Sequence, residues 1–179
     1  MLILWILFSI AAALAVWLGF WSLVSLFVRQ SRFHRQFISG TLPEAAPDGF
    51  YRGTAHIFFD RQTPWLGKSF DPAGGFGFNI FSPAGASILK MLAPFYRLFT
   101  VNEGGNTDAF YFETRVEAGL KDQDVNVIKL DYDRSENPLP IRIILDEIVA
   151  VGPDAYLGKI HLKVFPGFFT TIGYFSLRK

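Results

Sequence analysis

The segment Phe110-Tyr-Phe-Glu-Thr-Arg-Val-Glu117 decides the fold, because its apolar and polar side chains alternate. Successive side chains of a β-strand point to opposite faces, so this alternation is typical of a strand with one buried face. The same period of two recurs in Ile128–Tyr132 and Ile160–Val164. We therefore expect antiparallel strands that turn one face to a core.

Turn-forming residues divide the chain beyond residue 48 into eight or nine such strands. The candidate strands are Tyr51–Phe59, Trp65–Phe70, Phe76–Phe81, Phe95–Val101, Ala109–Leu120, Val125–Tyr132, Ile141–Val151, Ala155–Phe165 and Thr170–Leu177. Strands joined by short turns pair with their neighbours, and a sheet of this length closes on itself to remove its edges. The sequence predicts a mainly β domain, an antiparallel meander β-barrel, with one short helix over Ala84–Ala93 that caps one mouth.

The first 28 residues predict a single transmembrane helix. Leu2–Val28 contains neither a charged residue nor a proline, and as a helix it would be roughly 40 Å long. A hydrocarbon core of about 30 Å is crossed with length to spare. A cleaved secretory signal is disfavoured, because the basic residues follow the apolar run instead of preceding it. The expected organisation is residues 1–28 as the helix, 29–48 as a basic juxtamembrane segment and linker, and 49–179 as the barrel.

The basic residues after the helix predict its orientation. Arg29, Arg32 and Arg35 follow the span directly, so the positive-inside rule predicts an N-terminus outside and a barrel in the cytoplasm, at the inner or cytoplasmic membrane. Phe33 and Phe37, four residues apart, would share one helical face and leave the three arginines to contact lipid headgroups. The alternative is a plain polar linker.

A stripe of small residues runs along the predicted membrane helix. Ala11, Ala15 and Gly19 recur every four residues, a spacing that lets another helix approach closely. Partner packing and coincidence both account for it. If another helix packs there, the chain would be a subunit of a larger integral-membrane complex, respiratory or photosynthetic for example.

Composition excludes several function classes. The net charge is +1 and half of the residues are hydrophobic, which does not suit nucleic-acid binding. The chain has no cysteine, so disulfides, thiolate metal sites and cysteine nucleophiles are excluded. Membrane lipid and integral-membrane proteins are the expected partners.

Several short motifs resemble a known pattern: Gly49-Phe-Tyr-Arg-Gly53, Trp65-Leu-Gly-Lys-Ser-Phe-Asp71, Leu130-Asp-Tyr-Asp133, Tyr156-Leu-Gly158 and Gly173-Tyr-Phe-Ser-Leu177. They are similar to small bacterial domains named for a Gly-x-Trp-x-Gly signature, with Tyr51 in the place of the Trp. More loosely they resemble lipocalin-like (calycin) barrels, including the plastid lipid-associated fibrillins. The resemblance implies an antiparallel barrel with an apolar ligand, and no catalytic residues.

An eight-stranded barrel is either filled by side chains or holds one small ligand. The residues expected to line a ligand pocket are Tyr51, Trp65, Lys68, Phe70, Phe110, Phe112 and Tyr174. Lys68 would face an anionic headgroup at the barrel mouth or stand in water.

The polar residues offer weak candidates for chemistry. Asp131 and Asp133 would share a strand face, but a hard cation wants more oxygens than two carboxylates supply, so no metal is expected. Asp146 and Glu147 would point to opposite faces, and Asp146 is placed to pair with Arg142. His34, His56 or His161 could ligate a haem iron, although a solvated histidine is the simpler interpretation; haem or pigment is a minor alternative to no cofactor.

Two compatible hypotheses follow. In the first, the barrel is a membrane-tethered, non-catalytic module that binds a hydrophobic or lipid-like ligand at the cytoplasmic membrane surface. In the second, it is an accessory or structural subunit docked into a membrane complex through its helix. An enzyme is not expected, because no motif supplies a nucleophile or an acid and base pair.

Overall fold

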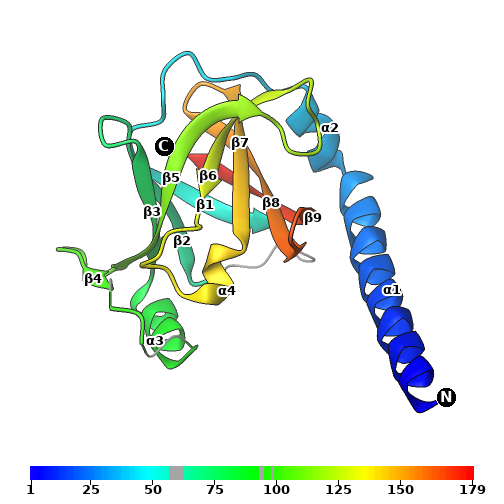
Figure 1. The fold of residues 1–179 in the computed structure, drawn as a ribbon. Coiled ribbons are helices and arrows are strands. Elements are labelled where there is room, and N and C mark those ends of the chain that lie inside the picture. Colours follow the sequence, from blue (N-terminus) through cyan, green and yellow to red (C-terminus); the bar gives the residue numbers. More distant parts are fainter. Residues whose placement is uncertain (57–62, 93–94, 98) are drawn as a thin grey trace.

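The computed structural model describes residues 1–56, 63–92, 95–97 and 99–179. Its main body is a closed barrel of eight antiparallel strands (Figure 1). The barrel strands are β1 (Gly49–His56), β2 (Trp65–Asp71), β3 (Phe76–Phe81), β5 (Thr107–Ala118), β6 (Asn126–Asp131), β7 (Ile144–Gly152), β8 (Ala155–Phe165) and β9 (Phe168–Arg178). Neighbours in sequence pair with each other, β9 pairs with β1, and β3 pairs with β5. The predicted mainly β meander barrel is confirmed.

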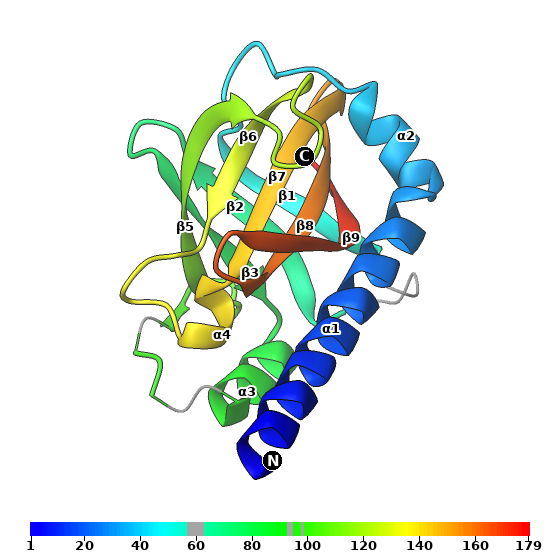
Figure 2. The same ribbon diagram turned by 45° about the vertical axis from the view of Figure 1, so that its right-hand side comes forward.

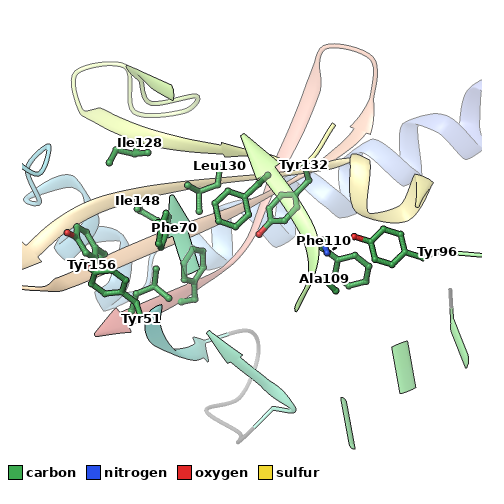
Figure 3. Close-up of a cluster of buried hydrophobic side chains, with 13 residues drawn as sticks. Tyr51, Phe70, Tyr96, Ala109, Phe110, Ile128, Leu130, Tyr132, Ile148 and Tyr156 are labelled. Atoms are coloured by element: carbon green, nitrogen blue, oxygen red, sulfur yellow. Dashed lines mark hydrogen bonds between the residues drawn. The ribbon is translucent and has the colours of Figure 1, made fainter. Parts of the chain in front are cut away.

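The inner faces of the strands carry the main hydrophobic core. It extends from Tyr51 and Tyr156 at one end of the barrel to Phe110 and Tyr96 towards the other (Figure 3). Between them Phe112 is completely buried, with edge-to-face contacts to neighbouring aromatic rings. The core fills the barrel at the end near Tyr51 and Tyr156, whereas the barrel stays partly open beside Phe110.

Two glycines allow the strands to approach each other closely. Gly67 lies at an irregularity of the β2–β3 pairing and has φ 146°, and a Cβ there would overlap the Tyr51 carbonyl on β1. Gly158 on β8 lies directly under the Phe175 ring, where a Cβ would overlap the ring atoms. Larger residues at either position would force the strands apart.

The N-terminal helix α1 (Leu2–Arg29) is long and apolar enough to cross a membrane. Every residue from Ile3 to Phe20 is exposed, and this part of the helix projects past one end of the barrel (Figures 1 and 2). From Trp21 onward, one side of α1 lies against β9. The Thr170 hydroxyl donates a hydrogen bond of 2.7 Å to the Trp21 carbonyl oxygen, and the Thr171 backbone N–H lies 3.5 Å from the Ser25 hydroxyl.

The small-residue stripe on α1 lies on the exposed part of the helix. A Cβ at Gly19 would meet no atom of the described chain within 4 Å, and Ala11 and Ala15 are exposed. That another membrane helix packs there stays a prediction.

The short helix α2 (Arg32–Ile38) packs on the barrel. Phe37 is completely buried against Val127, Val149 and Leu157, and Phe33 stacks on the His56 ring with centroids 4.2 Å apart. The two phenylalanines do share one face, but that face contacts protein. Arg32 and Arg35 remain exposed, whereas Arg29 is bound to Asp122.

Two further helices and one short strand complete the fold. Helix α3 (Pro83–Leu92) lies at one end of the barrel, close to its predicted range (Figure 1). The predicted strand Phe95–Val101 is wrong: within its described residues only Thr100–Val101 form a strand, β4. Helix α4 (Leu139–Arg142) is an addition, because the expected strand Ile141–Val151 begins only at Ile144. The end of the candidate strand Tyr51–Phe59 lies outside the described residues.

Candidate functional site

A cavity of about 330 Å³ occupies the part of the barrel that the core leaves open. Its wall is formed by residues near the ends of several barrel strands and by α4: Ala55, Thr63, Trp65, Lys68, Asn79, Phe81, Phe110, Tyr132, Ile141, Ile144, Asp146, Ile160, Ile172 and Phe175. Phe81, Ile141 and Ile172 are partly exposed, so the cavity opens at the end of the barrel where α3 and α4 lie (Figure 1). Most of the wall is aliphatic or aromatic.

Four buried polar residues form the inner part of the wall, and we call them the interior cluster: Lys68, Asn79, Tyr132 and Asp146. They come from β2, from β3, from the residue directly after β6, and from β7. The Lys68 ammonium donates hydrogen bonds of 3.0 Å to Asn79 Oδ1 and to Asp146 Oδ2, and a third to the Tyr132 hydroxyl. Lys68 is only 3% exposed. Barrel closure therefore places a buried ion pair inside an otherwise apolar interior.

The environment of Lys68 opposes its charge. Burial lowers the pKa of the Lys68 ammonium, and the Asp146 carboxylate partly offsets this effect. Aromatic rings surround the nitrogen, with the centroids of Phe175, Tyr132, Phe112 and Trp65 between 4.9 and 5.5 Å away. The faces of such rings attract a cation, so they help to keep a buried ammonium in place.

Tyr132 is fixed as a hydrogen-bond donor to Asp146. Burial, followed by the Asp146 charge, raises the pKa of the Tyr132 phenol well above its ordinary value, so the hydroxyl keeps its proton. The hydroxyl lies 3.3 Å from Asp146 Oδ2 and accepts hydrogen bonds from Lys68 and from Asn79 Nδ2, the latter at 3.0 Å. Its hydrogen-bonding capacity is used within the cluster.

One acceptor in the interior cluster has no donor. Asp146 Oδ1 is buried and receives no hydrogen bond from the described part of the chain. The three N–H groups of Lys68, in contrast, have three protein acceptors. Buried carboxylate oxygens normally accept hydrogen bonds, so Asp146 Oδ1 is an unused acceptor on a residue that lines the cavity.

Phe110 on the cavity wall has a strained backbone. Its φ is 55°, in the left-handed region that bulky residues rarely adopt. The Tyr96 hydroxyl accepts a 2.8 Å hydrogen bond from the Phe110 N–H (Figure 3), and Asn79 Nδ2 donates one of 3.0 Å to the Phe110 carbonyl. The interior cluster thus also fixes the shape of the wall, and backbone strain of this kind is often found at binding sites.

The structure divides the residues predicted to line the pocket. Trp65, Lys68 and Phe110 lie on the cavity wall. Tyr51, Phe70 and Phe112 belong to the hydrophobic core inside the barrel and do not line the cavity. Tyr174 lies on the outer face of β9 and packs against Phe37 of α2.

Sequence reasoning missed Asn79, Tyr132 and Asp146 as pocket residues, although a signal was present. Asp146 stands two residues from Ile144 and Ile148, on the inward phase of β7, and Lys68 shares the phase of Phe70. A charged residue on the apolar phase of a strand indicates a buried polar site.

A second polar group, which we call the outer cluster, joins the outside of the barrel to α1 and α2. The Asp122 carboxylate lies 3.2 Å from the Arg29 guanidinium of α1 and 3.9 Å from His34 Nε2 of α2, and it contacts the Lys159 ammonium. Nearby, Glu147 Oε2 is 3.0 Å from His161 Nε2, and the other imidazole nitrogen is 3.2 Å from the Thr171 hydroxyl. Asp146 and Glu147 point to opposite faces, as predicted.

Three further predictions concern single polar residues. The expected pair of Arg142 with Asp146 is wrong, because Arg142 pairs with Asp133 at 2.7 Å and Asp146 points into the barrel towards Lys68. His161 is completely buried, not solvated, because α1 covers its face of β8 and β9. Among the residues of the cavity wall there is no histidine, so none of the three lies where an enclosed haem would be ligated.

Comparison with protein families, with curated proteins and with solved structures finds no match to this chain.

Proposed function

We propose that the barrel binds one small, mainly apolar molecule whose polar end donates a hydrogen bond to Asp146, and that α1 holds this binding module at a membrane. The observation that carries the proposal is the pairing of an apolar cavity with a buried acceptor, Asp146 Oδ1, that has no donor in the described chain. Ligand sites commonly combine apolar walls with a few well-placed polar groups.

The cavity sets the size and polarity of the ligand. Its volume of about 330 Å³ is at the lower end of ligand pockets, so a single chain or ring system fits and a whole two-chain lipid does not. Because protein acceptors occupy the Lys68 ammonium, a carboxylate or phosphate finds no free donor there. An alcohol, an amide or an amine matches the free acceptor better.

The same geometry supports binding and not catalysis. Lys68 is one group in the wall that could act as a nucleophile, but its nitrogen is engaged by Asp146, Asn79 and Tyr132. A catalytic lysine needs a neutral nitrogen with access to a substrate.

Two neighbouring isoleucines provide a matched test. Ile144 lines the cavity, whereas Ile143 does not and is exposed. The full chain, purified in mild detergent, would be incubated with a membrane lipid extract, and bound molecules would be identified by mass spectrometry. The unmodified chain and Ile143→Trp should retain the same neutral alcohol, amide or amine, and Ile144→Trp should lose at least 90% of it. Recovery of no molecule from the unmodified chain, or equal recovery from both variants, would reject the proposal.

A further inference from the structure

Exposed apolar side chains gather at the end of the barrel where the cavity opens. On α4 and the following residue, Leu139 and Ile143 are exposed, and Phe165 is exposed at the β8–β9 turn. These three residues line one surface hollow together with Lys163. At the same end, Met91 of α3 is 74% exposed and Phe95 is 92% exposed. We call Ile88, Met91, Phe95, Leu139, Ile143 and Phe165 the apolar rim.

Single exposed apolar residues are ordinary, but six at one end of a barrel are a feature that needs a partner. The charged residues of the hollow also fit a lipid surface. Asp133 is neutralised by Arg142 at 2.7 Å, which leaves the exposed Lys163 as its unmatched charge among the described residues. A positive charge beside apolar side chains is typical of surfaces that enter anionic lipid headgroups.

The direction of α1 indicates that the partner of the apolar rim is the lipid bilayer. The strand β9 starts at the β8–β9 turn, and its third residue, Thr170, is bound to Trp21. Towards its N-terminus α1 therefore continues past the turn, on the same side as α3 and α4 (Figures 1 and 2). The exposed apolar length of α1 and the apolar rim thus point to the same side of the molecule.

The length of α1 allows both to reach lipid at once. The helix is roughly 40 Å long, more than the roughly 30 Å hydrocarbon core, and such helices tilt. Its side away from the barrel stays apolar and exposed up to Leu26 and Phe27. A tilt towards the barrel places these two residues and the rim at one membrane surface, with Arg29 at the headgroups.

We propose that the apolar rim rests in the surface of the bilayer that α1 crosses, so that the cavity opens into lipid and takes up its ligand without passage through water. This inference rests on the proposed membrane attachment of α1. It does not depend on which molecule the cavity binds.

The chain has no cysteine, so a nitroxide spin label reacts only with a cysteine that is introduced by substitution. Single-cysteine variants of the full chain would be reconstituted in vesicles of equal parts phosphatidylcholine and phosphatidylglycerol: Met91→Cys, Leu139→Cys and Phe165→Cys in the rim, Leu14→Cys in α1, and Ala73→Cys in the exposed turn between β2 and β3 at the opposite end. Collision of each nitroxide with oxygen, which concentrates in lipid, is compared with collision with a water-soluble nickel complex.

The rim labels should favour oxygen, as Leu14→Cys does, and Ala73→Cys should favour the nickel complex. If Leu14→Cys favours oxygen while the rim labels match Ala73→Cys, the rim does not enter lipid and the inference is wrong. Rim labels shielded from both reagents would indicate a protein partner and would also overturn it. If Leu14→Cys itself favours the nickel complex, the membrane attachment fails, and the inference with it.

A rim variant separates loading from binding. Leu139→Glu combined with Phe165→Glu should slow uptake of the ligand from donor vesicles at least tenfold, yet leave unchanged the amount bound when the ligand is supplied in detergent. Equal loss in both assays would show that the cavity was damaged, and unchanged uptake from vesicles would contradict lateral loading.

Discussion

Asp146 and Glu147 are adjacent carboxylates on one strand, yet they belong to two different kinds of buried polar site. Asp146 faces the barrel interior, pairs with Lys68 and keeps one oxygen without a donor. Glu147 faces outward, and its two oxygens are used by the Leu120 N–H at 2.5 Å and by His161 at 3.0 Å. Both side chains are buried, so exposure does not distinguish them.

The difference lies in hydrogen-bond satisfaction and in the neighbouring space. The outer cluster is sealed between the barrel and α1 and α2, and in the described chain each buried carboxylate oxygen in it has a partner. Such a network fixes two elements relative to each other. The interior cluster lies beside a cavity and has an unused acceptor. A satisfied network indicates a structural role, and the incomplete network beside open space is the feature on which the proposed binding rests.

The largest expected effect comes from breaking the interior ion pair. Lys68→Met keeps the aliphatic length of the side chain but leaves the Asp146 carboxylate buried without its cation, which should cost about 3 to 5 kcal/mol of unfolding free energy. Urea unfolding of the full chain in mild detergent, followed by near-ultraviolet circular dichroism, measures it.

The double variant Lys68→Met with Asp146→Leu is the control. It removes both charges and should recover most of the lost stability while abolishing ligand retention, because the acceptor is gone. If Lys68→Met alone lowered the unfolding free energy by less than about 1 kcal/mol, the buried Asp146 carboxylate would not depend on Lys68 for its stability, and this prediction would be wrong.

Asp122→Asn should have a smaller effect, on the outer cluster alone. The amide can still accept a hydrogen bond from Lys159 but no longer offsets the charges of Lys159 and Arg29, so the expected loss is about 1.5 to 3 kcal/mol. Hydrogen exchange of the α2 amides should accelerate, since this cluster binds α2 to the barrel. Ligand retention should be unchanged; a loss of ligand equal to that of Ile144→Trp would contradict the separate roles of the two clusters.

Acidification should loosen α2 through His34. Burial, followed by the charge of Lys159, lowers the pKa of this imidazole from its ordinary 6.5, although Asp122 opposes the shift and Arg29 adds to it. The folded state therefore binds the proton less readily than the unfolded state, and unfolding free energy rises with pH between the lowered pKa and 6.5.

Below that window the contribution of neutral His34 is lost. The protection factors of the α2 amides, which correct for the pH dependence of intrinsic exchange, should be lower at pH 5.5 than at pH 7.5, and His34→Gln should reduce the difference. The Tyr174 hydroxyl lies 3.2 Å from His34 Nδ1 but does not titrate in this pH range. Burial, followed by the Asp122 charge, raises the pKa of the Tyr174 phenol, so the phenol stays protonated. If His34→Gln showed the same pH dependence of the protection factors in α2 as the unmodified chain, His34 would not be its cause.

The sequence predicts the strands better than the sites they build. Phe76–Phe81 and Ala155–Phe165 match their predicted ranges, because alternation is a local property of each strand. Phe95–Val101 failed since its aromatic residues suggest a strand, whereas Tyr96 turns into the core. The interior cluster joins positions 68 and 146, which only barrel closure and strand register bring together. Tyr174 and Phe175 are adjacent aromatic residues on one strand, so the sequence does not show which of them points into the barrel. Phe175 is the one on the cavity wall.

The smallest expected effect is on an exposed ion pair of comparable geometry. Arg115 lies 2.6 Å from Asp131 and 2.7 Å from Glu117, closer than Lys68 lies to Asp146, but its side chain is 41% exposed. Water already solvates these groups, so Arg115→Gln should cost between about 0 and 1 kcal/mol, and 1 M salt should remove most of that. The same urea titration that gives a several-fold larger loss for Lys68→Met would then show that burial, and not contact distance, makes the interior pair important. A loss as large as that of Lys68→Met would instead mean that distance alone decides, and the contrast between the two carboxylate sites would have to be abandoned.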